Sequence, residues 1–190
     1  MSTVTIFGTG NMGTAIAGVV AAGGASVQHI GPDETATIQG EVVVLAVPYA
    51  ALAPIAAAYA DQLEGKIVVD ITNPLDFETF DALVVPVGSS AAAELAALVP
   101  GAKVLKAFNT TFAGTLAAKK VGPVDTTVLI AGDDADAKGT LAALVSAGGV
   151  KAIDAGSLKR AHELEALGFL QLTLAAGEKV SWTGGFGVIN

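Results

Sequence analysis

The sequence of 190 residues contains no cysteine, which excludes a disulfide, a cysteine nucleophile and a cysteine-ligated metal site. It also contains no run of about 18 or more apolar residues free of glycine and polar breaks, so a membrane-spanning helix is not expected. The N-terminus has no basic leader and leads straight into a predicted strand, which argues against secretion. We therefore expect a cytoplasmic protein that does not bind a membrane.

Positively charged residues are scarce. The chain has 10 Lys and Arg residues against 18 Asp and Glu residues, and its formal net charge is −8. Because affinity for nucleic acid comes mainly from Lys and Arg side chains, no nucleic-acid partner is expected. The histidines, His29 and His162, have no nucleophile or carboxylate at a catalytic spacing, and we predict structural or solvent-facing roles for them. No cluster of His or acidic residues has the spacing of metal ligands, so no metal is predicted.

Apolar segments, by contrast, run through the whole chain, and hydrophobic residues make up 52% of it. Short β-branched runs alternate with alanine-rich segments, which is the pattern of βαβ units. We predict an α/β fold, namely a Rossmann-type, doubly wound, mostly parallel sheet with helices on both faces. Residues 31–40 leave room only for a loop or a single turn, so the second crossover is unusually short.

The predicted organisation is a single domain over residues 1–190, with a Rossmann core at 1–108 and a C-terminal α/β extension at 109–190. Strands are predicted at Thr3–Phe7, Ser26–Ile30, Glu41–Val47, Lys66–Ile71, Lys103–Phe108, Thr126–Ala131 and Val150–Asp154. Helices are predicted at Asn11–Ala22, from Pro54 to Gln62, at Ser89–Leu98, Phe112–Lys119 and Ala135–Ala147, and from Gly156 to Ala176.

A glycine-rich turn, Gly8-Thr9-Gly10-Asn11-Met12-Gly13, directly follows the first predicted strand and opens the first predicted helix. This context strengthens a G-x-G-x-x-G match that would be weak on its own. Gly8 permits the tight turn, Gly10 lets the backbone approach a pyrophosphate, and Gly13 allows close packing of helix on strand. Amides at the helix start then face the phosphates, so we predict dinucleotide binding here.

Polar or proline-marked residues follow three later strands. They are Ala46-Val47-Pro48-Tyr49, Thr72-Asn73-Pro74 and Asn109-Thr110-Thr111. Each set taken alone is compatible with ordinary turn chemistry. Three such sets beside a glycine-rich turn, at the sheet edge where ligands bind in open α/β folds, favour a binding site.

Other residues support weaker predictions. Asp133-Asp134 precedes a predicted helix and is interpreted as an N-cap pair. Lys106 lies near the candidate site, but we predict a solvated lysine rather than a ligand contact. Leucines of the last helix form a stripe that faces either the core or a second subunit. Trp182 and Phe186 either close over an acceptor ring or pack at a subunit interface, and a homodimer is expected.

Taken in order, the motifs resemble a known group of enzymes, the NADPH-dependent reductases of the 8-hydroxy-5-deazaflavin coenzyme and their short bacterial dinucleotide-binding relatives. A more distant similarity is to the cytoplasmic domain of six-transmembrane ferric reductases. The resemblance covers nearly the whole chain and implies a Rossmann-type reductase. It rests on Ile6–Gly13, Ala46–Pro48, Asp70–Leu75, Lys106–Thr110, Ala131–Asp134 and Asp154–Leu158.

The sequence departs from the deazaflavin reductases at two places. Asn109-Thr110 stands where they carry a His-Thr pair and resembles the short relatives and the ferric-reductase domains, so a reductase that uses a flavin or another acceptor is expected rather than a strict deazaflavin reductase. Gly31-Pro32-Asp33 stands where they carry a Gly-Ser-Arg turn, and no Lys or Arg occurs before Lys66. The cofactor is therefore NADP or NAD, and the local charge slightly favours NAD. Asp33→Arg is expected to shift the preference toward NADPH.

We interpret the protein as an oxidoreductase that transfers a hydride from NAD(P)H to a small-molecule acceptor such as a flavin or deazaflavin. Direct hydride transfer needs no nucleophile or metal, only close positioning of donor and acceptor. Asn109 and Thr110 are predicted to orient the nicotinamide or the acceptor. Two alternatives remain open, a redox sensor that binds dinucleotide without turnover and a short imine or hydroxyacid reductase.

Overall fold

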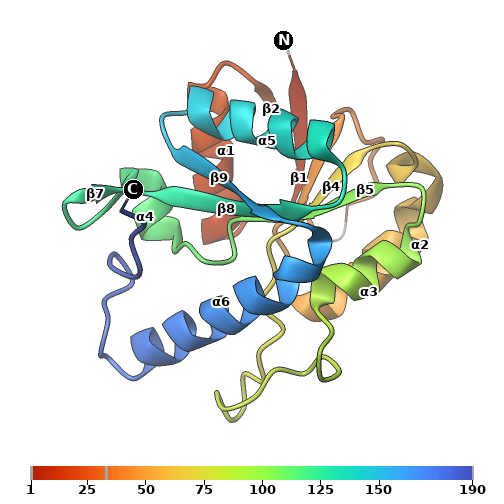
Figure 1. The fold of residues 1–190 in the computed structure, drawn as a ribbon. Helices are drawn as coiled ribbons and strands as arrows, with labels where there is room; N and C mark the ends of the chain where they lie inside the picture. Colours follow the sequence, from red (N-terminus) through yellow and green to blue (C-terminus); the bar gives the residue numbers. More distant parts are fainter. Residues whose placement is uncertain (1, 33, 190) are drawn as a thin grey trace.

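The computed structural model describes residues 2–32 and 34–189, and a seven-stranded sheet forms its centre (Figure 1). The strand order is β2-β1-β3-β4-β5-β8-β9. Strands β1 to β5 pair in parallel, whereas β8 and β9 are parallel to each other and antiparallel to β5. The strands are β1 (Thr3–Phe7), β2 (Ser26–Ile30), β3 (Val42–Leu45), β4 (Ile67–Asp70), β5 (Lys103–Lys106), β8 (Thr127–Gly132) and β9 (Lys151–Gly156).

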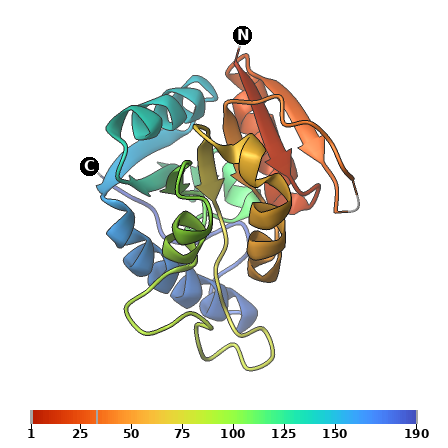
Figure 2. The same cartoon turned by 90° about the vertical axis from the view of Figure 1, so that its right-hand side faces the viewer.

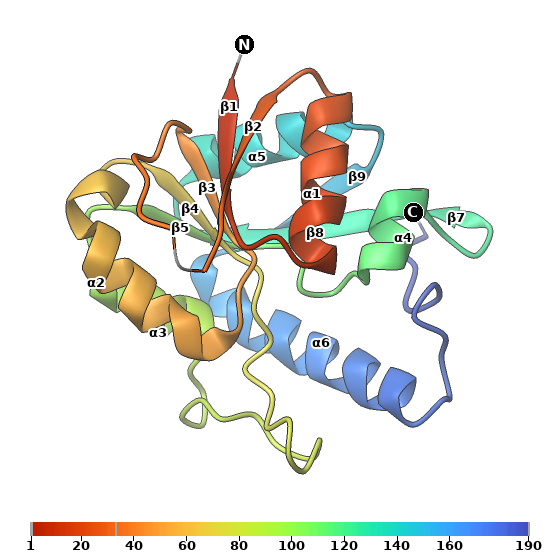
Figure 3. The same cartoon turned by 180° about the vertical axis from the view of Figure 1, so that it is seen from behind.

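Helices cover both faces of the sheet (Figures 1 and 3). One core contains side chains of α1, α4 and α5, and the other contains side chains of α2 and α3. The mostly parallel, doubly covered sheet of the sequence prediction is therefore confirmed. The helices are α1 (Asn11–Ala22), α2 (Leu52–Leu63), α3 (Ala91–Leu98), α4 (Ala113–Ala118), α5 (Ala135–Ala147) and α6 (Ala161–Ala176), with 3₁₀ turns η1 (Tyr49–Ala51) and η2 (Leu158–Arg160).

The short second crossover is confirmed for its described residues, which form an extended loop between β2 and β3. Buried backbone groups need hydrogen-bond partners whether or not they lie in a helix. Here side chains supply them: Gly40 N donates to Thr5 Oγ1 at 2.9 Å, and Ile38 N donates to Gln62 Oε1 at 2.8 Å. A crossover helix is thus unnecessary at this position.

Two predicted boundaries in the C-terminal half are wrong. Strand β9 extends through Gly156, and the last helix begins only at Ala161, after the turn η2. The Leu158 amide is held by Asp133 Oδ1 at 2.9 Å, which keeps this segment out of the helix. The prediction also missed a hairpin of two-residue strands, β6 (Lys120–Val121) and β7 (Val124–Asp125), which are too short to show a period.

The ends of four parallel strands lie in one row. Phe7, Leu45, Asp70 and Lys106 are register partners across β1, β3, β4 and β5. The segments that follow these residues therefore meet at one edge of the sheet, the edge at which α/β folds bind ligands. Helix α6 crosses this edge, and the long segment between β4 and α3 projects beside it (Figure 2). Within residues 2–32 and 34–189, no helix combines the length and apolarity needed to cross a membrane.

Candidate active site

Gly8 and Gly13 fix the turn between β1 and α1 by their lack of a side chain. Gly8 has φ of +101°, and a Cβ there would lie 2.2 Å from the Ala46 carbonyl oxygen. A Cβ on Gly13 would lie 2.5 Å from the Gly8 carbonyl oxygen. Any larger residue at either position would therefore push β1, β3 and α1 apart. These two glycines serve the close packing that the sequence predicted for the turn.

Gly10 differs, because the space in front of it is open. A Cβ built on Gly10 would meet no atom within 4 Å, and Gly10 is the N-cap of α1 without a side-chain capping bond. Thr14 N makes the first bond of the helix, to the Gly10 carbonyl at 2.9 Å. The amides that precede Thr14 point out of the helix start and can donate to an anion. This geometry fits a pyrophosphate resting on the turn.

A first pocket of about 470 Å³ lies on one side of this turn. Its walls come from the turn itself, the ends of β2 and β3, and the first part of α2. Apart from Glu34, its lining carries no charged side chain among the described residues. The lining residues are Phe7, Gly8, Thr9, Gly10, Ile30, Gly31, Pro32, Glu34, Ala46, Val47, Pro48, Ala51, Pro54, Ile55 and Tyr59.

A second pocket of about 420 Å³ lies on the other side of the turn. It is closed by Phe112 and Trp182, whose ring centroids are 5.0 Å apart, and by Leu172 of α6. The residues that continue the turn, Asn11 and Met12, also line it. The remaining lining residues are Ile71, Asn73, Phe108, Asn109, Thr111, Ala113, Gly114 and Thr183.

Asn73 and Asn109 form a reciprocal pair in the wall of the second pocket. Asn73 Nδ2 donates to the Asn109 carbonyl at 2.9 Å, and Asn109 Nδ2 donates to Asn73 Oδ1 at 2.9 Å and to the Leu164 carbonyl at 2.8 Å. Asn109 is 5% exposed, yet its Oδ1 has no partner within the described residues, and neither has Thr72 Oγ1. Buried polar oxygens normally accept a hydrogen bond, so this wall has spare capacity for a ligand's N–H or O–H group.

Gly168 of α6 packs directly on this pair, which sequence analysis missed because a glycine inside a helix has no evident role. A Cβ at Gly168 would lie 2.2 Å from Asn73 Oδ1 and 3.0 Å from Asn109 Nδ2. The lack of a side chain at this one residue lets α6 approach the ends of β4 and β5.

Gly168→Ala is therefore expected to lower the free energy of unfolding by about 1–3 kcal/mol, because the added methyl group overpacks a site that cannot expand freely. The measurement is urea unfolding of the variant and the wild type. Gly139→Ala in α5, where a Cβ meets nothing within 4 Å, is the matched control and should not destabilise the protein. Equal stability of Gly168→Ala and wild type would contradict the close contact.

Lys106 is not the solvated lysine that was predicted. Its side chain is fully buried, and its ammonium lies 2.8 Å from Asp70 Oδ2 and 2.8 Å from Glu165 Oε1. It also donates to the Thr72 carbonyl. The prediction was wrong because a carboxylate on the neighbouring strand and another on α6 compensate the buried charge, which the local sequence of β5 does not reveal.

Glu165 joins α6 to the start of α3. Its Oε2 accepts from Ala91 N at 3.0 Å, and its Oε1 accepts from Ala92 N at 3.4 Å. Burial raises the pKa of the Glu165 carboxyl, although the Lys106 ammonium and the Ala91 amide act in the opposite direction. Sequence analysis gave no signal for Glu165, since its role depends on α6 crossing the strand ends.

Several predicted cofactor residues lie elsewhere than expected. The Tyr49 hydroxyl donates to the Glu94 carboxylate of α3, and this bond raises the pKa of Tyr49 to about 12. The Pro74 carbonyl accepts from Val84 N, and the Thr110 carbonyl accepts from Gln171 Nε2. Tyr49, Thr72, Pro74 and Thr110 do not line either pocket. Asp33 lies outside the described residues.

Glu34 follows β2 in the loop that leads to β3 and lines the first pocket. Its Oε2 accepts from Gly31 N at 2.8 Å, which folds the carboxylate back over the turn after β2.

His29 Nδ1 lies 3.2 Å from the Gly8 carbonyl, and His162 Nδ1 lies 2.9 Å from the Ser89 carbonyl. Asp134 caps α5 through Ala137 N, as predicted, whereas Asp133 holds Leu158 N instead.

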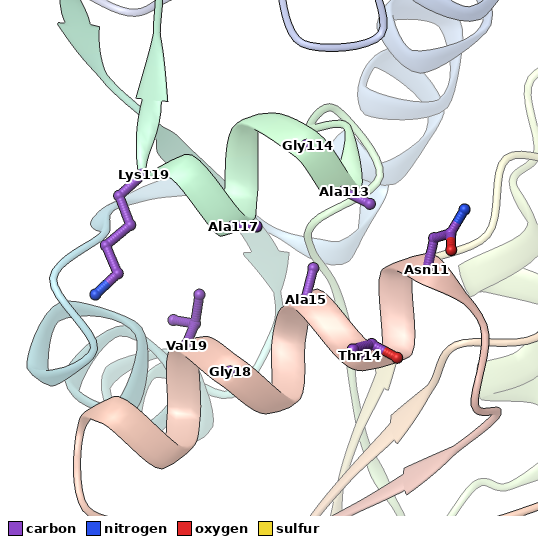
Figure 4. Close-up of a pocket in the computed structure, with 9 residues that line it drawn as sticks. All are labelled: Asn11, Thr14, Ala15, Gly18, Val19, Ala113, Gly114, Ala117 and Lys119. Carbon is purple, nitrogen blue, oxygen red and sulfur yellow. The ribbon is translucent and has the colours of Figure 1, made fainter.

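A third pocket of about 500 Å³ lies between α1 and α4 (Figure 4). Figure 4 shows the small side chains of Ala15, Ala113 and Ala117 along this groove, with Lys119 beyond them. The part of its lining that the structure describes carries no acidic residue or histidine. Among the described residues, no group of three or more His, Asp or Glu side chains could hold a metal ion.

The chain is similar to enzymes of one reductase family. The F420-dependent NADP reductase of Methanocaldococcus jannaschii is 31% identical over 156 residues, which cover 80% of this chain and 70% of that enzyme. The chain belongs to the F420-dependent NADP reductase family. The family model described as "NADP oxidoreductase coenzyme F420-dependent" matches residues 22–74. The family assigned from the sequence motifs is thereby confirmed.

Two further comparisons extend this family assignment. Metalloreductase STEAP3 of Rattus norvegicus is 38% identical over 147 residues, which cover 75% of this chain but only 28% of that protein. A crystal structure of a protein from Arthrobacter sp. FB24, provisionally named an F420-dependent NADP reductase, aligns over 100% of both chains with 27% identity and a TM-score of 0.86. That structure and this one share the same Rossmann-like architecture from end to end.

Proposed function

We propose that this member of the F420-dependent NADP reductase family transfers a hydride between NAD(P)H and a deazaflavin or flavin ring. The observation that carries the proposal is the pair of pockets joined by consecutive residues of one turn. Gly8, Thr9 and Gly10 line the first pocket, and Asn11 and Met12 line the second. A dinucleotide laid over the turn would place one end in each pocket.

In this arrangement the first pocket receives the adenosine half, and Gly31, Pro32, Ala46, Val47 and Pro48 form its walls. The open face of Gly10 and the amides at the start of α1 hold the pyrophosphate. The second pocket receives the nicotinamide, whose carboxamide is an N–H donor matched to the unpartnered Asn109 Oδ1.

When bound, NAD(P)H supplies the hydride, and the chain supplies only position and environment. The second pocket must bring the two rings within about 3–3.5 Å of each other. Phe112, Trp182 and Leu172 exclude water from that space, while the Asn73–Asn109 pair fixes the orientation of the ring on the opposite wall. Hydride transfer between two rings requires no general base, and the described residues that line this pocket include no acidic residue or histidine.

The test is oxidation of NADH and NADPH by the purified protein with a panel of acceptors: a deazaflavin, flavins, quinones and ferric chelates. We expect rapid oxidation with a deazaflavin or a flavin. Tight dinucleotide binding without oxidation by any acceptor would favour a redox sensor. The imine or hydroxyacid reductase alternative is less well supported, because strand and helix still alternate after Asn109 instead of forming a large helical domain.

We also propose that NADH binds at least as tightly as NADPH, in contrast to the name of the family. The Glu34 carboxylate lines the first pocket, which has no lysine or arginine among its described lining residues. Repulsion between a carboxylate and a 2′-phosphate about 4–6 Å apart would reduce the binding free energy of NADPH by on the order of 1–4 kcal/mol. The lower figure applies to the dielectric constant of water and the higher one to that of a protein surface. The same carboxylate can accept hydrogen bonds from the free ribose hydroxyls of NADH.

Glu34→Gln should therefore raise the affinity for NADPH about fivefold or more relative to NADH, since it removes the charge and keeps an oxygen for Gly31 N. Isothermal titration of both cofactors measures the ratio of dissociation constants. Glu41→Gln, an equal change of charge at the amino end of β3, is the matched control. A clear preference of the wild type for NADPH would contradict the argument from charge.

We further propose a cytoplasmic homodimer built on one domain. Apolar side chains of α6 and the tail remain exposed, with Leu170 at 49% and Trp182 at 54%. One core cluster joins residues of the predicted 1–108 core, such as Val44, to residues of the predicted extension, such as Leu141. Sedimentation velocity of the full chain tests the oligomeric state.

A further inference from the structure

We propose that Lys106, together with Asp70 and Glu165, acts as a positioning cluster for the nicotinamide half of the dinucleotide. The three side chains are buried and line neither pocket, but Asp70 and Lys106 end the strands that lead to the pocket residues Asn73 and Asn109. Their role is to fix the strand ends that carry Thr72, Asn73 and Asn109. This inference rests on the proposed function only in that the second pocket receives the nicotinamide.

The cluster connects four elements at one point. Asp70 and Lys106 are register partners at the ends of β4 and β5, and Glu165 comes from α6. Glu165 also holds the first amides of α3. The relative placement of both strand ends, α3 and α6 thus depends on one ammonium group.

On the β4 side, the cluster holds the backbone that leads to Asn73. Asp70 Oδ1 accepts from Thr72 N at 2.7 Å, and the Lys106 ammonium donates to the Thr72 carbonyl. Because both its amide and its carbonyl are held, Thr72 has little freedom to shift. Asn73 follows directly and presents its side chain to Asn109.

On the β5 side, the chain makes a strained turn between Lys106 and Asn109. Phe108 is fully buried and has φ of +63°, a left-handed conformation that is costly for a bulky residue. The Phe108 carbonyl accepts from Thr111 N at 3.0 Å and from Thr111 Oγ1 at 2.8 Å. Such strain persists only where the surroundings over-determine it. Lys106 anchors one side of the turn, and the bond from Asn109 to the Leu164 carbonyl anchors the other.

Stability alone does not account for this cluster. Two carboxylates and one ammonium are withdrawn from water, and a buried ion cluster is commonly no more stable than a well-packed apolar replacement. The cluster does affect the position of Asn109 in the pocket. The Leu164 carbonyl accepts from Asn109, and the next residue of α6, Glu165, contacts Lys106. The same stretch of helix therefore holds both Asn109 and Lys106.

The test compares the binding of NADH with that of ADP-ribose, which lacks the nicotinamide ring. Titrations are made on the full-length wild type, on Lys106→Met and on the neutral variant Asp70→Asn/Lys106→Met/Glu165→Gln. The neutral variant is included because Lys106→Met leaves two carboxylates buried without a cation and is prone to unfold. Lys103→Met is the matched control, since Lys103 lies on the same strand but pairs with Asp134 near the surface.

We expect a folded variant to bind NADH about tenfold more weakly and ADP-ribose nearly as well as the wild type, because only the nicotinamide contacts are displaced. Lys103→Met should change neither dissociation constant. An unchanged ratio of the dissociation constants of NADH and ADP-ribose in a folded variant would overturn the proposal, and so would failure of both variants to fold. If the wild type binds NADH but no acceptor oxidises it, the proposed hydride transfer fails while the ratio still tests the positioning cluster.

Discussion

Gly10→Val is expected to abolish dinucleotide binding while the protein remains folded. Gly10 has φ of −72°, which a valine can adopt, and a Cβ there meets no protein atom within 4 Å. The added side chain would instead fill the space in front of the first amides of α1. A steric clash of about 3 kcal/mol corresponds to on the order of a 100-fold loss of affinity. Isothermal titration with NADH and NADPH measures it.

A graded series sharpens this test. Gly10→Ala should weaken binding less than Gly10→Val, because the obstruction is smaller. Gly139→Val introduces the same side chain at an open, exposed position of α5 and should leave binding unchanged. Circular dichroism establishes that each variant is folded. If a folded Gly10→Val protein bound the dinucleotide with wild-type affinity, the turn would not be part of the binding site.

Asn109→Ala is expected to lower turnover by about 10- to 100-fold and to lower turnover by more than it weakens cofactor binding, the signature of an interaction that matters mainly in the transition state. The Asn109 side chain joins Asn73 to the Leu164 carbonyl, lines the proposed nicotinamide pocket and has one oxygen without a partner among the described residues. Its loss would free the ring to adopt unproductive orientations.

The measurement is steady-state kinetics with the best acceptor, together with titration of the cofactor. Thr173→Ala is the matched control. It truncates a polar residue of α6 that lines neither pocket, and the hydroxyl that it removes bonds to the local Leu170 carbonyl. Equal turnover in Asn109→Ala and wild type would show that Asn109 does not orient the ring and is only a turn residue.

Most of the fold could be predicted because its signals are local. The bounds of α1 and α5 and of β1 and β2 agree with the sequence prediction, since glycines or capping aspartate delimit them. The glycine turn was also predictable, because its meaning depends on a strand before it and a helix after it. These features need no knowledge of what packs across the sheet.

The parts of the site that were missed depend on α6. Gly168 and Glu165 acquire their roles only because this helix crosses the ends of β4 and β5, and nothing in its spacing indicates that crossing. The sequence does contain one indication that Lys106 is buried, because Lys106 ends a buried strand and Asp70 ends the neighbouring one. Opposite charges at matching ends of adjacent buried strands indicate a buried pair more readily than two solvated residues.

The central claim is direct hydride transfer between rings held in one pocket, and a deuterium-transfer experiment tests it most directly. Nicotinamide cofactor with both hydrogens of the reactive carbon replaced by deuterium is oxidised by the protein with the deazaflavin coenzyme F420. The acceptor atom of a deazaflavin is carbon, so a transferred deuteride does not exchange with water. The account predicts deuterium on that ring carbon of the product. Oxidation of the cofactor by the deazaflavin with the label released into solvent would contradict it, and so would oxidation of the cofactor by neither a deazaflavin nor a flavin.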